Sequence, residues 1–430
     1  MSTNRIDDSC KIAFVGCKME FELEAQMPMI HFQANRQGAT LRASEVKPKL
    51  DKYLLDRCRE QKINMEKENL DYKMQITLKE PGEVVRLEVK NKKMENGKER
   101  WKIDREKTYS IFYGNMNVAK EDQKKGLFSN PTITIICFHE QIRKLLEEHI
   151  VDFFLTTNFG TMQRKGFGSF IPKGWCKNDE LSLEEKQKVA RALRRVTGGA
   201  CYAMTFKDIS KAKKDKESMN KFCVRMSEEI KQFYSIMKSG RNHGGYIRSY
   251  IYQYGHNKLK LGNEKFWMKD KGIAPKVGKN YETDNDKTHK PKYLRALLGV
   301  GEKIEYKTCD AEGNILKNKV VSVTIKSKNV ERCETPIYFK VIRNVVFIAA
   351  YPVPEGLYGQ SFSFSSVKKN GKDTILNTEK SGTLSVPTKD ELPNKKAFDI
   401  QDFLKSYVWY YNNKVKAKNK VSVSEVKIDG

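Results

Sequence analysis

Alternation of apolar and polar residues dominates the first third of the chain and predicts β-strands. Residues 19–25 place apolar side chains opposite acidic ones, as in a strand with one buried face. Residues 71–79 and 83–90 alternate in the same way, and the Pro-Gly pair between them is typical of a hairpin turn. Residues 132–138 form a short apolar run, which predicts a buried strand.

Segments with apolar residues at helical spacing lie between and after these strands in the chain. This spacing predicts helices over residues 44–60, 139–155 and 182–196. Glu185 follows Ser182 by three residues, which is the spacing of a capping box at the start of the third helix. The resulting order of strand, helix, two strands, helix and strand predicts a ferredoxin-like domain, with helices on one face of an antiparallel sheet.

Strand-like alternation returns in the second half of the chain. Residues 319–326, 337–341 and 345–350 predict strands, and residues 397–411 predict an aromatic-rich helix. Residues 255–292 are rich in lysine, glycine, asparagine and aspartate without clear periodicity, which predicts a long loop. The second half therefore also predicts an α+β domain.

The chain has 430 residues, more than one ordinary hydrophobic core supports, so two domains are expected. The predicted fold class is α+β, with two ferredoxin-like (RRM-like) domains, antiparallel sheets and long basic loop insertions. The first domain is predicted over residues 1–210 and contains a glycine-rich loop. The second is predicted over residues 211–430 and contains a basic, aromatic-rich helix and loop region.

The net positive charge of the chain gives a first indication of function. Lysine and arginine number 81 against 54 aspartate and glutamate, which gives a formal net charge of +27. Such an excess creates a positive field that attracts polyanions and speeds their encounter with the protein. A lysine-rich surface that is merely solvated is the alternative interpretation.

Membrane, disulfide and metal chemistry are not indicated by the sequence. No apolar run is long enough to span a bilayer, and the first residues lack the layout of a signal peptide. The nine cysteines form no CxxC pair, which argues against a disulfide scaffold or a zinc site built from close pairs. We therefore expect a cytoplasmic protein with reduced thiols, no membrane contact, no metal and no cofactor.

Residues 158–170 (NFGTMQRKGFGSF) form the most informative motif. Glycine adopts positive φ and permits close backbone approach, and successive exposed amides can form a concavity that binds anions. Arginine and lysine beside the Gly-Phe-Gly step add charge for phosphate. A tight structural turn remains the equal alternative. The candidate contacts to a nucleic-acid backbone are Arg164, Lys165, Gly166, Phe167, Gly168 and Ser169.

A second basic region is independent of this motif. Residues 230–263 contain no acidic residue, yet they hold six lysine or arginine residues and six phenylalanine or tyrosine residues. Basic side chains can neutralise phosphates while aromatic rings stack on unpaired bases, each stack contributing ~1–3 kcal/mol. The alternative is that the rings belong to the core and the lysines are solvated. The candidate residues are Arg241, Tyr246, Arg248 and Tyr252, the last three on or near a helix predicted over residues 246–254.

The motif at residues 159–170 resembles the glycine-rich loop of the RAMP (repeat-associated mysterious protein) superfamily of CRISPR-associated proteins. It is most similar to that of the Cmr-type head subunit of type III-B effector complexes. Residues 21–29, 39–47, 293–299 and 331–340 resemble further segments of that subunit. The resemblance implies ferredoxin-like domains, guide or target RNA as the ligand, and other RAMP-type effector subunits as partners. Arg42 and Lys47, in the segment that enters the first helix, then join the candidate RNA contacts.

These observations lead to one functional hypothesis and two alternatives. The hypothesis is an RNA-binding, non-catalytic subunit of an antiviral CRISPR effector, which grips the RNA backbone while base pairing reads the sequence. The first alternative is a RAMP endoribonuclease that processes guide RNA. His31 follows the first strand, roughly where such ribonucleases place a general acid or base. The second alternative is a generic basic assembly protein that binds nucleic acid.

Overall fold

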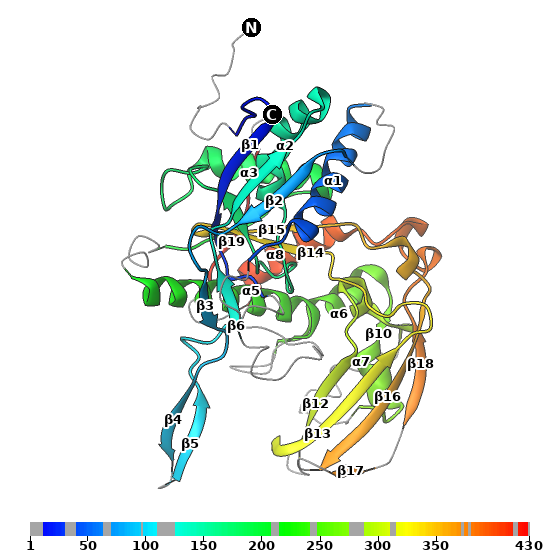
Figure 1. The fold of residues 1–430 in the computed structure, drawn as a ribbon. Coiled ribbons are helices and arrows are strands. Elements are labelled where there is room, and N and C mark those ends of the chain that lie inside the picture. Colours follow the sequence, from blue (N-terminus) through cyan, green and yellow to red (C-terminus); the bar gives the residue numbers. More distant parts are fainter. Residues whose placement is uncertain are drawn as a thin grey trace. The chain divides into compact units, whose positions relative to one another are not determined.

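The computed structural model of the protein shows two compact units (Figure 1). It describes residues 12–30, 40–62, 70–95, 98–109, 125–207, 215–240, 247–274, 288–309, 315–370, 374–376, 380–415 and 420–428. Unit 1 comprises Met1–Lys231, Tyr338–Ala349 and Asn419–Gly430, and unit 2 comprises Gln232–Ile337 and Ala350–Lys418. Late segments of the chain therefore return to unit 1. The domain boundary predicted between residues 210 and 211 lies outside the described residues.

The first sheet of unit 1 has the strand order β2-β7-β1-β8, and every neighbouring pair is antiparallel. Its strands are β1 (Lys18–Ala25), β2 (Lys73–Thr77), β7 (Thr132–Ile136) and β8 (Phe170–Pro172). Helix α1 (Ala43–Glu60) follows β1, and helix α2 (Glu140–Thr156) follows β7. The strands and helices predicted here from periodicity are thus confirmed to within a few residues.

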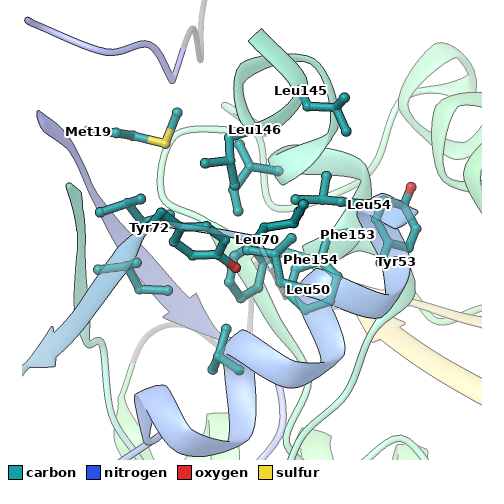
Figure 2. Packing of buried hydrophobic residues seen from close by; sticks show 14 of the residues in the cluster. Met19, Leu50, Tyr53, Leu54, Leu70, Tyr72, Leu145, Leu146, Phe153 and Phe154 are labelled. Carbon is teal, nitrogen blue, oxygen red and sulfur yellow. The ribbon is translucent and has the colours of Figure 1, made fainter. Parts of the chain in front are cut away.

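Aromatic and aliphatic side chains join this sheet to its two helices in one core (Figure 2). Met19 comes from β1, Leu50 and Leu54 from α1, and Phe153 and Phe154 from α2. The rings of Phe153 and Phe154 lie 5.0 Å apart in an edge-to-face arrangement. Burial of each such side chain contributes ~1.5–3 kcal/mol, so both helices are fixed to the same face of the sheet.

The hairpin predicted from residues 71–79 and 83–90 is wrong. Strand β2 pairs with β7, whereas β3 (Glu83–Arg86) pairs with β6 (Lys125–Phe128) in a separate ribbon. Gly82 explains the difference, because a Cβ built there would lie 2.9 Å from Leu127 and 3.0 Å from the Phe128 oxygen. The glycine therefore admits close approach of β6 instead of turning the chain back on β2.

A second ribbon, β4 (Lys90–Glu95) paired with β5 (Lys98–Ile103), extends beyond β3 and β6 (Figure 1). Trp101 is 65% exposed on this ribbon, and Met94 and Ile103 are also exposed. The Nζ of Lys92 lies 5.6 Å from the centroid of the Trp101 ring. The ribbon was not predicted, since residues 83–90 have the pattern of one continuous strand.

The second sheet of unit 1 has the order β14-β15-β9-β19. Its strands are β9 (Tyr202–Thr205), β14 (Ile337–Ile342), β15 (Val345–Ala350) and β19 (Val423–Glu425). Strand β9 is antiparallel to both β15 and β19. Every residue of β14 and β15 is buried, which explains their nearly continuous apolar sequence.

Helix α3 (Leu183–Thr197) precedes β9, and helix α5 (Lys216–Lys238) follows it in the chain. The predicted capping box of α3 is confirmed, since Glu185 donates its amide hydrogen to the Ser182 hydroxyl oxygen and accepts one from the Ser182 amide at 2.7 Å. Gly198 ends the helix in a left-handed conformation, with φ of +75°.

Unit 2 contains an antiparallel five-stranded sheet in which β12, β13, β16 and β17 follow one another and β18 pairs with β16. The strands are β12 (Lys303–Cys309), β13 (Ile315–Lys326), β16 (Ser361–Asn370), β17 (Thr374–Leu376) and β18 (Ser381–Ser385). Its helices include α6 (Tyr250–Tyr254), α7 (Glu264–Asp270) and α8 (Ile400–Lys414). The chain is thus α+β with several antiparallel sheets, as predicted.

The prediction of one long loop over residues 255–292 is wrong where the structure describes it. A π-helical turn (Gly255–Leu259) and α7 lie in this segment. Asn263 caps α7 by accepting a hydrogen bond from the Phe266 amide at 3.0 Å. The helix is too short and too polar to produce a periodic apolar pattern. Among the helices of the described residues, none combines the length and apolar character needed to cross a membrane.

Candidate nucleic-acid interface

The glycine turn (residues 158–170) lies between α2 and β8 and folds back on itself. The amide of Phe159 donates to the carbonyl oxygen of Gly168 at 3.0 Å. Gly168 has φ of +63°, and a Cβ built there would lie 1.9 Å from the Phe159 oxygen. Gly166 also has positive φ, at +86°. Glycine is therefore required here by the geometry of the turn itself.

The Gly-Phe-Gly step of the glycine turn is buried. Phe167 is 1% exposed, and its ring centroid lies 5.9 Å from that of Tyr109. A Cβ built on Gly166 would lie 3.0 Å from Val341 and 3.3 Å from Ile230. These contacts give the step a packing role. RNA contact stays a prediction for the four buried residues Gly166, Phe167, Gly168 and Ser169.

Amide groups of the glycine turn donate to acceptors within the protein. The Gly160 amide donates to Glu45 Oε1 at 2.7 Å, and the Gly168 amide donates to the Pro28 carbonyl oxygen at 3.0 Å. The expectation that successive amides lie open to an anion is therefore wrong at these two positions. The hydrogen bonds that hold the turn in place already use them.

The rim of the glycine turn (residues 161–165) is partly accessible to solvent, and Arg164 and Lys165 are both half-buried there. The Arg164 Nη1 and Lys165 Nζ atoms themselves are buried. The Arg164 guanidinium carbon lies 5.6 Å from the centroid of the Tyr338 ring, and Lys165 Nζ lies 5.6 Å from that of Phe339. The Phe339 amide donates to the Arg164 carbonyl oxygen at 3.2 Å. Two adjacent cations are thus held against β14.

Lys340 of β14 fixes both ends of the glycine turn. The residue is fully buried, and its Nζ donates to the carbonyl oxygens of Thr157 at 2.8 Å and Phe170 at 3.1 Å. Burial lowers the pKa of the Lys340 amine well below its usual value. The Ser169 hydroxyl donates to the Val341 carbonyl oxygen at 2.6 Å. Lys340 lies in one of the segments with a family resemblance, but no local pattern pairs it with a loop so far away in the chain.

Lys49 of α1 is a second structural cation that sequence analysis missed. Its Nζ donates to the Asn158 carbonyl oxygen at 3.2 Å and to Gln163 Oε1 at 2.8 Å. It also pairs with Glu45 at 3.1 Å, the carboxylate that accepts the Gly160 amide. The four-residue spacing of Glu45 and Lys49 was the available signal. Helix α1 therefore braces the glycine turn.

The two candidates near the start of α1 lie in different surroundings. Lys47 Nζ donates to Asp51 Oδ2 at 2.7 Å and to the Leu70 carbonyl oxygen at 2.9 Å, and it lies 4.1 Å from the centroid of the Tyr72 ring. These contacts hold the half-buried Lys47 amine against the protein. Arg42 is exposed at the N-cap position of α1. Of the two, Arg42 is the better placed to reach a ligand.

The candidates in the basic region of residues 230–263 also differ in their exposure to solvent. Arg248 is half-buried, just before α6. Tyr252 is 3% exposed, and its hydroxyl donates to the buried Glu264 Oε1 at 2.7 Å. Burial raises the pKa of Tyr252 well above its usual value. Base stacking needs an exposed ring, so Tyr252 does not offer one in this structure. Three candidates lie outside the described residues: His31, Arg241 and Tyr246.

Other aromatic residues of this region also belong to the core of unit 2. The ring of Phe233 lies 4.7 Å from that of Tyr407, centroid to centroid. The Tyr254 hydroxyl donates to Asp402 Oδ2 at 2.7 Å. The part of the alternative interpretation in which the rings are packed therefore applies to these residues. Lys238 is not simply solvated, because its Nζ donates to the Leu298 carbonyl oxygen at 3.2 Å.

Comparison with protein families decides which proteins the chain resembles over its length. Residues 16–241 match the family model of the Cmr1 N-terminal domain, and residues 246–428 match that of the Cmr1 C-terminal domain. The chain belongs to the Cmr1 family. A search of curated proteins finds no match. Cmr1 proteins are type III-B CRISPR proteins, so the chain is one subunit of a multisubunit effector complex with other Cmr subunits.

Residues covered by both Cmr1 domain matches meet at the glycine turn. The turn lies in the N-terminal Cmr1 match, whereas Lys340 and the rest of β14 lie in the C-terminal match. Both belong to unit 1. The Cmr1 C-terminal sequence therefore builds the surface against which Arg164 and Lys165 rest. Arg248 lies in the C-terminal match but in unit 2.

Proposed function

We propose that this Cmr1 family protein is an RNA-binding, non-catalytic subunit that holds guide or target RNA by its backbone. The observation that carries the proposal is family membership over both halves of a chain with a net charge of +27. In CRISPR effectors, base pairing between guide and target supplies sequence recognition, so a subunit needs only to bind the phosphate chain. Cytoplasmic localisation and a role in antiviral defence belong to the same proposal.

Ferredoxin-like architecture is part of this proposal. The β-α-β-β-α-β order and the sheet order β2-β7-β1-β8 support it for the first domain. The elements β9, α5, β14, β15, α8 and β19 repeat that order, and their strands form the sheet β14-β15-β9-β19. We infer that the second domain begins at β9. Its long insertion between α5 and β14 would supply the five-stranded sheet's first strands and the basic region.

The proposed RNA surface begins at the rim of the glycine turn. Arg164 and Lys165 are adjacent, half-buried cations whose Nη1 and Nζ atoms are themselves buried, so in this proposal they act on a phosphate chiefly through the local positive charge of the rim. Arg42 adds an exposed cation in the same unit, and Arg248 is the candidate in unit 2. The buried glycines act indirectly, because they fix the position of the rim.

The experiment is filter binding of the intact chain to single-stranded RNAs of unrelated sequence. Affinity is expected to be equal among sequences to within about threefold, since phosphate contacts carry no sequence information. Raising salt from about 50 mM to about 200 mM is expected to weaken binding about 100-fold for roughly five phosphate contacts. Absence of binding at the lower salt, or an affinity indifferent to salt, would count against the proposal.

Denaturing gels of the same mixtures test the non-catalytic part. The RNA is expected to remain intact on prolonged incubation, with repeat RNA included among the substrates. Cleavage that disappears in His31→Ala would instead support the endoribonuclease alternative.

A further inference from the structure

A cationic pocket of about 390 Å³ lies in unit 2. Its volume is in the range of pockets that bind small ligands. The lining residues are Ile247, Arg248, Gln253, His256, Asn257, Tyr410 and Lys414. Arginine, lysine and histidine are present, and none of the described lining residues is acidic. The pocket is therefore suited to an anion with attached polar groups.

Side-chain contacts join the two walls of this pocket. Gln253 Nε2 donates to the Arg248 carbonyl oxygen at 3.0 Å and to the Tyr410 hydroxyl at 3.0 Å. The Tyr410 ring lies 4.9 Å from that of Tyr250, centroid to centroid. These contacts connect the segment that includes α6 to helix α8. The pocket is held in shape before any ligand arrives, which reduces the entropic cost of binding.

An exposed tryptophan lies beside the same pocket. Trp409 is 59% exposed on α8, next to the lining residue Tyr410. Lys414, another lining residue, places its Nζ 5.7 Å from the centroid of the Trp409 ring. Tryptophan is usually well buried, and this exposed indole, close to the lining residue Lys414, offers a ring face for stacking beside a site for negative charge.

We propose that this pocket and Trp409 together bind one unpaired nucleotide of an RNA strand. The phosphate lies at Arg248 and Lys414, and the base stacks on the Trp409 ring. The inference rests on the proposed RNA-binding function and adds to it a preference for a strand state. A paired base is stacked within its helix and cannot lie on the indole, so this site distinguishes unpaired RNA from duplex.

The test compares Trp409→Ala with Trp101→Ala in the intact chain. Trp101 is exposed to a similar extent on the β4–β5 ribbon, so Trp101→Ala removes the same kind of ring from a different place. Fluorescence anisotropy would measure the affinity of each variant for a labelled single-stranded RNA and for the same RNA in a duplex. Trp409→Ala is expected to weaken single-strand binding roughly 5- to 150-fold, which is the loss of one stacked base. The affinity of Trp409→Ala for the duplex is expected to stay within about twofold of that of the unmodified chain. The affinities of Trp101→Ala for single strand and duplex are expected to stay within the same limit.

A second variant tests the phosphate half of the site. Arg248→Glu with Lys414→Glu is expected to weaken single-strand binding strongly at low salt and less at high salt, whereas the loss in Trp409→Ala persists at both. Equal effects of Trp409→Ala on single strand and duplex, or no effect on either, would overturn the pocket assignment. An unmodified chain that binds no RNA would instead overturn the proposed function, so the two failures are separable.

Discussion

Reversing both charges at the rim of the glycine turn, with Arg164→Glu and Lys165→Glu, is expected to weaken RNA binding about 10- to 100-fold at low salt. Two cations that neutralise phosphates become two anions that repel them, and fewer counterions are released on binding. The loss is expected to shrink as salt rises, because the effect is electrostatic. Filter binding of single-stranded RNA at several salt concentrations measures it.

The matched control is Arg191→Glu with Arg194→Glu. Both residues are exposed on α3, and the double substitution changes the net charge of the chain by the same amount. Its RNA affinity is expected to fall by no more than about threefold. Equal losses in the two variants would mean that only total charge matters, and the assignment of the rim would fail. Thermal melting of each variant first shows that the fold is retained.

Gly168→Ala is expected to destabilise the protein by about 3 kcal/mol or more. The residue has φ of +63°, and its new Cβ would lie 1.9 Å from the Phe159 oxygen, so the turn must open. Opening breaks the Phe159–Gly168 hydrogen bond and disturbs the neighbouring Phe167 packing. Urea unfolding followed by tryptophan fluorescence measures the free energy of unfolding.

Gly174→Ala separates backbone strain from collision. Gly174 also has positive φ, at +81°, but a Cβ built there has no atom within 4 Å. This variant is expected to lose only ~1 kcal/mol, the usual cost of a left-handed alanine. Similar losses at the two glycines would show that the glycine turn is not packed as the structure has it.

Local patterns determined much of the first domain in advance. The strands and helices around the core of Leu50, Leu54, Phe153 and Phe154 follow from periodicity, and the Ser182 capping box follows from spacing. The pairing of the strands did not follow from these local patterns. The partners of β2 and β3 come from residues 125–136, and no turn signal at residues 81–82 distinguishes a hairpin from strands that join a four-stranded sheet and a separate ribbon.

The candidate site shows the same limit. Composition located the glycine turn and its two cations, but burial of Phe167 and the brace from Lys340 depend on β14, which lies far away in the chain. Aromatic content predicted base stacking near Tyr252, yet that ring is buried, while the exposed indole of Trp409 lay in a segment predicted as an aromatic-rich helix with no ligand assigned to it. A sequence pattern gives residue types, whereas solvent exposure depends on tertiary packing.

Ultraviolet cross-linking of RNA within the assembled effector complex, followed by mass spectrometry of the cross-linked peptides, would show whether this chain contacts RNA. Guide or target RNA is expected on peptides of this chain, including the one that contains residues 161–165. A complete complex in which RNA cross-links to other subunits, but to no peptide of this chain, would contradict the proposed function.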